Sequence, residues 1–148
     1  MTALTLAKTE DLDRLLPLVR AFHTESGMDV LEEERTAGLK PLLEGSPYGG
    51  VWLVGPPRAP IGYVVICFGW SVEFGGMDGF VDELYIRPSV RGRGIGTDVL
   101  INLPKQLAKN GLRAIHLEVS RVAVRTQEAY KRAGFKPRAD YMLMTRRM

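Results

Sequence analysis

Glycine and arginine alternate in one short stretch of the chain, RGRGIGT, which runs from Arg91 to Thr97. Glycine lets the backbone come close to a ligand and adopt a positive φ. Apolar residues recur every four positions from Ile95 onward, which predicts that a helix begins there. The start of a helix has free N–H groups and a partial positive charge. With two guanidinium groups beside it, this arrangement predicts a phosphate-binding site rather than a plain strand-to-helix turn.

Two common phosphate-binding motifs do not fit this stretch. A P-loop ends in lysine followed by serine or threonine, whereas Gly96 is followed by Thr97 and Asp98. The dinucleotide fingerprint Gly-x-Gly-x-x-Gly needs a third glycine where Thr97 stands, and it normally opens its domain. The pattern therefore favours a phosphate ligand of another kind.

Two adjacent carboxylates, Asp82 and Glu83, come shortly before the glycine turn. They lie in the segment Phe80–Ile86, whose β-branched and aromatic residues predict a strand. Alternation points neighbouring side chains of a strand to opposite faces, unless a bulge intervenes. Each acid fits two roles, a proton acceptor for a reaction or a paired structural carboxylate.

The spacing Arg91-x-x-Gly94-x-Gly96 resembles the acetyl-CoA pyrophosphate motif of the GNAT superfamily of N-acetyltransferases. The later segment Ala129–Phe135, AYKRAGF, is similar to that family's Tyr-x-x-x-Gly-Phe segment. The resemblance implies acetyl-CoA as co-substrate. It also implies that cofactor-binding residues come from the strand, whose backbone lines the pantetheine arm, and from the turn around the pyrophosphate: Leu84, Tyr85, Ile86, Arg91, Gly92, Arg93, Gly94, Ile95, Gly96 and Thr97.

The resemblance also implies a reaction, the direct attack of a primary amine on the thioester. An alkyl amine is protonated at neutral pH, so a base must take its proton first. We expect Glu83 to be this base, with Asp82 as the other candidate. Tyr130 matches the family tyrosine that protonates the departing thiolate, although a tyrosine that only packs is an alternative. Ala123 stands where many relatives carry asparagine, so one cofactor contact is not expected from that helix.

The acceptor is open among a polyamine, an amino acid, an aminoglycoside and a protein N-terminus. The run Asp82–Tyr85 is similar to the paired-acid segment of diamine and polyamine acetyltransferases, which favours the small-amine type. Four acidic residues near the expected acceptor side would attract a cationic amine: Glu25, Asp29, Glu73 and Asp78. The alternative function is a catalytically silent acyl-CoA-binding sensor, which would share the glycine turn.

Length and composition fit one domain over residues 1–148. The net charge of +3 does not require a nucleic-acid partner. The longest apolar run, Tyr63–Phe68, is too short to span a membrane, and the start lacks a signal pattern, so a cytoplasmic protein is expected. Cys67 is expected to be a small buried side chain, His23 at most a pocket residue and His116 structural, with no metal site. The family resemblance adds a homodimer as an expectation.

Alternating and helical patterns predict the elements that position these residues. The expected order is strand, two helices, three strands, helix, strand, helix and a final hairpin. The ranges are Leu4–Leu6, Thr9–Gly27, Glu32–Leu43, Val51–Val54, Ile61–Phe68, Phe80–Ile86, Ile95–Asn110, Ala114–Val119, Val122–Ala133, and Phe135–Arg138 with Tyr141–Thr145. The glycines and acids of the segment Trp70–Gly79 predict a hairpin loop that joins its two neighbouring strands. The predicted class is α/β (α+β), a GNAT-like mixed, mostly antiparallel sheet with one parallel βαβ unit and helices on both faces.

Overall fold

The computed structural model describes residues 2–148. Its main elements are β1 (Leu4–Leu6), α1 (Leu12–Glu25), α2 (Glu32–Leu43), β2 (Gly49–Val54), β3 (Gly62–Ser71), β4 (Gly76–Ile86), α3 (Ile95–Ala108), β5 (Leu112–His116) and α4 (Val124–Arg132). Short 3-10 turns precede α1 and α3. The helices and the first five strands of the predicted order are all present.

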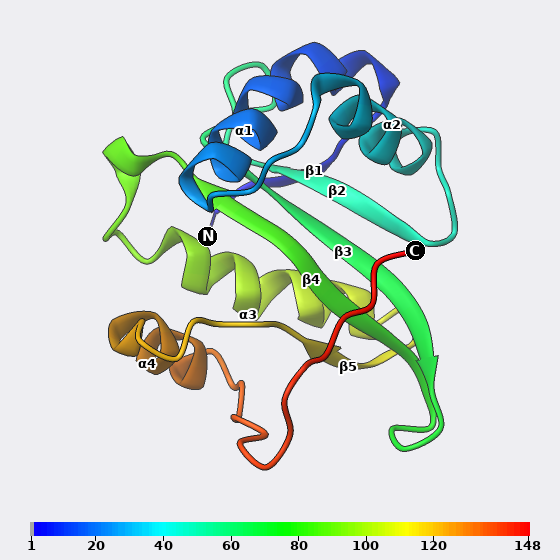
Figure 1. The fold of residues 1–148 in the computed structure, drawn as a ribbon, viewed down its shortest axis with the longest axis vertical. Coiled ribbons are helices and arrows are strands. Elements are labelled where there is room, and N and C mark those ends of the chain that lie inside the picture. The colour runs from blue at the N-terminus through cyan, green and yellow to red at the C-terminus, as the bar shows by residue number, and fades with distance from the viewer. Residues whose placement is uncertain (1) are drawn as a thin grey trace.

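The strands form a single sheet in the order β1-β2-β3-β4-β5 (Figure 1). The first four strands pair antiparallel, and β4 pairs with β5 in parallel. Because α3 connects β4 to β5, these three elements make the one parallel βαβ unit. The predicted mixed, mostly antiparallel sheet is confirmed.

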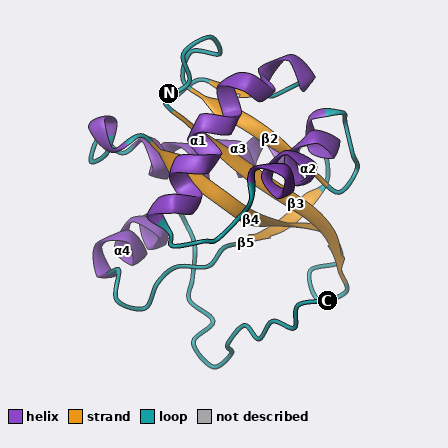
Figure 2. Cartoon of the chain, turned by 45° about the horizontal axis from the view of Figure 1, so that its top comes forward, coloured by secondary structure: helices purple, strands orange, loops and turns teal. Residues whose placement is uncertain are grey.

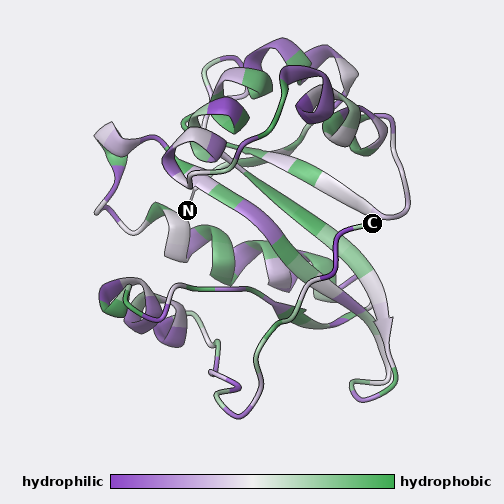
Figure 3. Cartoon of the chain, viewed as in Figure 1, coloured by the Kyte–Doolittle hydropathy of each residue, from purple (hydrophilic) through white to green (hydrophobic). Residues whose placement is uncertain are grey.

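Helices cover both faces of the sheet, as Figures 1 and 2 show. On one face, α1 and α2 bury Leu15, Val19 and Leu39 against Tyr63 and its strand neighbours. On the other face, the buried side of α3 packs on the inner residues of β3 and β4, with α4 alongside. Figure 3 shows these apolar layers, together with a hydrophilic stretch in β4. We call the two sides the α1/α2 face and the α3/α4 face.

The connection between β3 and β4 is much shorter than the sequence predicted. The predicted hairpin is confirmed, but the extent of its loop over Trp70–Gly79 is wrong, because β3 continues to Ser71 and β4 already begins at Gly76. Trp70 pairs with Met77 across this hairpin. The glycines that suggested a loop are tolerated here because each strand supplies the other with a continuous hydrogen-bonding partner.

The final hairpin predicted over Phe135–Arg138 and Tyr141–Thr145 is also wrong, because neither range is a strand. Arg138 instead forms an ion pair with Glu73 at 3.3 Å and lies over the Phe74 ring. These contacts hold the segment after α4 beside the β3–β4 hairpin. Figures 1 and 2 show it as an irregular chain. A strand pattern without an edge to pair with does not form a strand.

Candidate active site

The two parallel strands separate halfway along β4. Pairing between β4 and β5 ends where Phe80 meets His116. β5 itself stops at His116, although its predicted range ran to Val119. Within residues 2–148, the rest of β4, which contains Leu84, Tyr85 and Ile86, therefore pairs with no strand on that side. Unpaired backbone groups of this kind can hydrogen-bond a ligand that enters the gap.

A β-bulge in β4 decides where the two adjacent carboxylates point. Val65 pairs with Glu83 and the next residue of β3 pairs with Val81, so Asp82 is the extra residue. The bulge leaves Asp82 exposed. Glu83 lies opposite Val65 and hence on the α1/α2 face, where its carboxylate is only partly exposed. The bulge thus breaks the simple alternation of side chains at the candidate base.

Glu83 accepts hydrogen bonds on both carboxylate oxygens. The Tyr63 hydroxyl donates to Oε1 at 2.8 Å, and His23 Nε2 lies 2.6 Å from Oε2. Behind the imidazole, Arg35 Nε donates to His23 Nδ1 at 3.2 Å. Residues of α1 and β3 thus contact the Glu83 carboxylate on β4 directly, and Arg35 of α2 supports the imidazole from behind. Such contacts fix the orientation of the carboxylate before any substrate arrives.

Burial and negative charge keep the groups around Glu83 protonated. Burial raises the pKa of the Tyr63 hydroxyl far above its usual range, and the Glu83 charge raises it further. Tyr63 is therefore a permanent hydrogen-bond donor to Glu83. Burial, then Asp82 and Glu83, also raise the pKa of the Cys67 thiol, so Cys67 is not an activated nucleophile.

The turn before α3 has the geometry of an anion site. Gly92 and Gly94 adopt φ of +79° and +76°, a backbone conformation that residues other than glycine rarely adopt. Within residues 2–148, no side chain caps the first turn of α3, so its N–H groups remain free for a ligand. A hollow of about 460 Å³ lies against this turn, lined by Thr2, Arg93, Gly94, Ile95 and Asp98. Free N–H groups at the start of a helix are donors of the kind that bind an anion.

The two arginines of the turn lie in different surroundings. Arg93 lines the hollow at the start of α3. The Arg91 guanidinium instead donates to Glu25 and to the Ile86 carbonyl, both at 2.7 Å, and lies over the Tyr85 ring. Arg91 therefore ties the end of α1 to the end of β4, and Arg93 is the cation that faces the hollow.

Tyr130 lies on α4, where it is partly buried in the apolar cluster of the α3/α4 face. Its ring centroid is 6.3 Å from that of Phe135, so both ends of the AYKRAGF segment pack together. Burial raises the pKa of the Tyr130 hydroxyl, which keeps it protonated. Glu83 and Tyr130 thus lie on opposite faces of the sheet.

A second, shallow cavity of about 200 Å³ lies further down β4 and is lined by Cys67, Phe68, Gly69, Asp78, Gly79, Phe80 and His116. The strand register places Phe80 opposite both Cys67 and His116, so their side chains share the α1/α2 face with Glu83. His116 Nε2 lies 3.2 Å from Asp78 Oδ2, which fits its predicted structural role.

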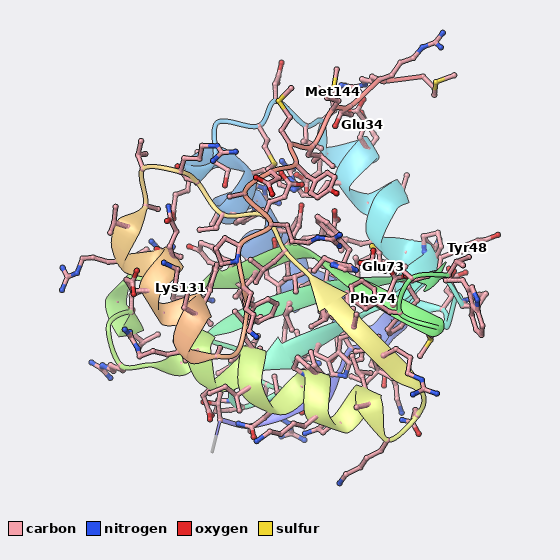
Figure 4. The ribbon with its side chains drawn as sticks, turned by 90° about the horizontal axis from the view of Figure 1, so that it is seen from below. Glu34, Tyr48, Glu73, Phe74, Lys131 and Met144 are labelled. Atoms are coloured by element: carbon pink, nitrogen blue, oxygen red, sulfur yellow. The ribbon has the colours of Figure 1, made fainter. Side chains whose placement is uncertain are left out.

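Three of the four acidic residues expected to attract an amine are engaged within the protein. Glu25 pairs with Arg91, Glu73 with Arg138 and Asp78 with His116. Figure 4 shows Glu73 and Phe74 at the tip of the β3–β4 hairpin. A paired carboxylate attracts a cation less than an unpaired one does. Asp82, which is exposed at the bulge next to Glu83, is therefore better placed to attract an amine than these three acids.

Sequence reasoning missed the partners of Glu83. His23 was expected to be at most a pocket residue, and Arg35 and Tyr63 were not considered. A signal for both helical residues was present: His23 continues the stripe of Leu15 and Val19, and Arg35 that of Leu39 and Leu43. A charged or polar side chain on an apolar stripe faces the interior and therefore needs a partner there.

Residues 2–148 contain neither a cluster of three or more potential metal-ligating side chains nor a helix with the length and apolarity to cross a bilayer.

The model of the acetyltransferase (GNAT) family matches residues 12–135. The chain belongs to the GNAT family. It is therefore an acetyltransferase, and the co-substrate of this family is acetyl-CoA. No curated protein matches the chain.

Solved structures agree with the GNAT fold. An integron cassette protein from the mobile metagenome of Cole Harbour Salt Marsh is 31% identical, with a TM-score of 0.83 over 98% of this chain and 90% of that one. An aminoglycoside N-acetyltransferase in complex with CoA shares the fold at 12% identity, with a TM-score of 0.80 over 100% and 96% of the two chains. A ribosomal-protein-alanine N-acetyltransferase from Brucella melitensis does so at 16% identity, with a TM-score of 0.76 over 100% and 99%.

Gly96 offers a test of the GNAT cofactor site, because the fold itself does not need glycine there. It lies in the first turn of α3 without a positive φ, and a Cβ would meet nothing within 4 Å. We expect Gly96→Ala to stabilise the protein by about 0.5–1 kcal/mol while weakening acetyl-CoA binding, because the methyl group occupies the ligand's approach. Thermal unfolding and calorimetric titration measure the two effects.

Gly38→Ala is the matched control for Gly96→Ala. Gly38 lies inside α2, also without a positive φ or a neighbour within 4 Å of its Cβ position. It should give a similar gain in stability and leave acetyl-CoA binding as it is. Wild-type affinity in Gly96→Ala would contradict a ligand against this turn.

Proposed function

We propose that this enzyme transfers the acetyl group of acetyl-CoA directly to a primary amine, with Glu83 as general base and Tyr130 as general acid. The observation that carries the proposal is the carboxylate of Glu83, which His23 and Tyr63 hold on the α1/α2 face beside the gap between β4 and β5. Asp82 is the second candidate base. Its exposed position at the bulge makes it better suited to attract the amine than to hold a proton in one geometry.

The reaction needs a base on the side of the amine and an acid on the side of the sulfur, because the nitrogen loses two protons and the sulfur gains one. Glu83, directly or through one water, takes a proton from the ammonium form of the acceptor. The amine nitrogen then forms the C–N bond to the acetyl group as the C–S bond breaks, and the sulfur leaves with the bonding electrons. Tyr130 supplies a proton to that sulfur from the α3/α4 face, the nitrogen gives its second proton to water as the neutral amide forms, and Glu83 and Tyr130 return to their starting protonation states by exchange with solvent. Backbone groups of Leu84, Tyr85 and Ile86 bind the part of the co-substrate that lies in the gap.

The acceptor that best fits is a small primary amine. The cavity of about 200 Å³ beside the Asp78–His116 pair has room for a small molecule or a single terminal residue. Two enzymes that share this fold are named for very different acceptors, an aminoglycoside and the alanine of a ribosomal protein. The fold therefore does not select between these classes, and the acceptor side of the α1/α2 face must do so.

Calorimetric titration with acetyl-CoA, followed by thiol release with a panel of primary amines, tests the proposal. NAD and ATP are the controls, since both also carry phosphates. We expect selective binding of acetyl-CoA and release of free thiol with at least one small amine. Equal binding of all three ligands would contradict the site at Arg93 and Gly94. Tight acetyl-CoA binding without thiol release from any amine would instead indicate a sensor.

A further inference from the structure

A line of hydrogen bonds runs from α2 through α1 to the candidate base on β4. Arg35 Nε donates to His23 Nδ1 at 3.2 Å, and His23 Nε2 lies 2.6 Å from Glu83 Oε2. His23 is 6% exposed and Arg35 is 8% exposed, so water is not their alternative partner. Burying an arginine is costly unless its donors are satisfied, which makes its presence here informative.

These contacts fix where the proton of His23 is. A guanidinium has only donors and keeps its protons, so the Nδ1 atom that accepts from Arg35 carries no hydrogen. The single N–H of the neutral imidazole is then on Nε2, and it is donated to Glu83. A second proton on Nδ1 would face Arg35 and break this hydrogen bond. His23 therefore has no free lone pair with which to take a proton from a substrate.

Arg35 is itself held in place by its other donors. Nη1 donates to Glu32 Oε2 at 2.5 Å, and Nη2 donates to the Val30 carbonyl at 3.0 Å. Glu32 also accepts from Arg20. The charged or titratable groups that face His23 are thus Arg35 with Glu32 behind it on α2, Glu83 on β4, and Tyr63 on β3, which reaches His23 through Glu83. The nearby Phe22 ring carries no charge.

We propose that Arg35 is a positioning residue, which fixes His23 as a neutral donor and through it holds Glu83 as the only proton acceptor of the buried network. The inference rests on the proposed role of Glu83 as base. A histidine next to a carboxylate is normally able to act as a base itself. Here Arg35 removes that ability, so the proton of the amine goes to the carboxylate.

The first test uses the free protein and needs no turnover. The chain contains two histidines, so His116→Gln leaves His23 as the one imidazole. Its nitrogen-15 NMR spectrum should show the Nε2–H tautomer. Adding Arg35→Met should allow the Nδ1–H tautomer to appear, because Nδ1 then no longer faces a donor. An Nδ1–H tautomer in His116→Gln would overturn the proposal, whether or not the protein transfers acetyl groups, and this arm does not depend on the folding of an Arg35 variant.

The second test is the pH profile of kcat/KM. Arg35→Met should lower activity at neutral pH about tenfold, the effect of losing one charge-assisted hydrogen bond. It should also add an acidic limb, because His23 can then become an imidazolium that pairs with Glu83. His23→Gln is the partner variant, since an amide can still donate to Glu83 and accept from Arg35 but does not protonate in this range.

The double variant Arg35→Met/His23→Gln separates positioning from a merely structural effect. It should lack the added acidic limb, because no imidazole remains to take the proton. A loss of activity in Arg35→Met by the same factor at every pH would mean that Arg35 only stabilises the fold, and would overturn the proposal. An added limb that survives in the double variant would do the same, since it would come from another group.

Discussion

Glu83→Gln is expected to lower kcat by about 10²- to 10⁴-fold, the usual contribution of a general base. The amide is nearly the same size as the carboxylate, so the fold and acetyl-CoA affinity should stay close to wild type. Its oxygen can accept from His23, whose proton is on the facing nitrogen, while its NH₂ group can donate to the Tyr63 hydroxyl. The loss is therefore that of a proton acceptor, measurable as thiol release at saturating amine.

Asp82→Asn is the comparison that assigns the base. Asp82 is the neighbouring carboxylate, exposed at the bulge and outside the hydrogen-bond network of Glu83. We expect a smaller loss in kcat and a higher KM for a cationic amine, because this change removes attraction rather than proton transfer. If Asp82→Asn lost the larger part of kcat and Glu83→Gln kept it, the two roles would have to be exchanged.

Local signals were sufficient to predict most of the helices. The range Glu32–Leu43 was predicted for α2 and is found with the same bounds. Three acidic residues open that helix, and Gly45, with φ of +92°, follows its end. The start of α3 at Ile95 was predicted equally well, since the glycines of the turn mark it. Such boundaries depend on neighbours in sequence, which a single chain reveals.

The parts that sequence could not predict depend on distant pairing. The bulge at Asp82 is a change of register between β3 and β4 next to Val65, and the residue types there do not predict it. His23 and Glu83 are 60 positions apart, so their contact needs the packing of α1 on β4. The segment Tyr141–Thr145 has the composition of a strand, yet strand formation also requires a free edge in reach. Non-local geometry, rather than residue type, decides each of these features.

Tyr130→Phe is the second change with a large expected effect. We expect kcat to fall by about 10²-fold or more, the contribution of a general acid, with acetyl-CoA affinity near wild type. Phenylalanine keeps the ring that packs against Phe135, so the stability of α4 should change little. Tyr48→Phe is the matched control, since it removes the hydroxyl of an exposed tyrosine far from α4 in the sequence.

The pH profile distinguishes an acid from a side chain that only packs. Burial raises the pKa of Tyr130 above its ordinary value of 10.0, so its proton is present throughout the neutral range and is lost only as pH rises through the raised pKa. The wild-type rate should therefore fall at high pH through a limb that Tyr130→Phe lacks, because that variant has no proton to lose. Full activity in Tyr130→Phe, or an unchanged alkaline limb, would assign proton donation to another group and leave Tyr130 a packing role on the α3/α4 face.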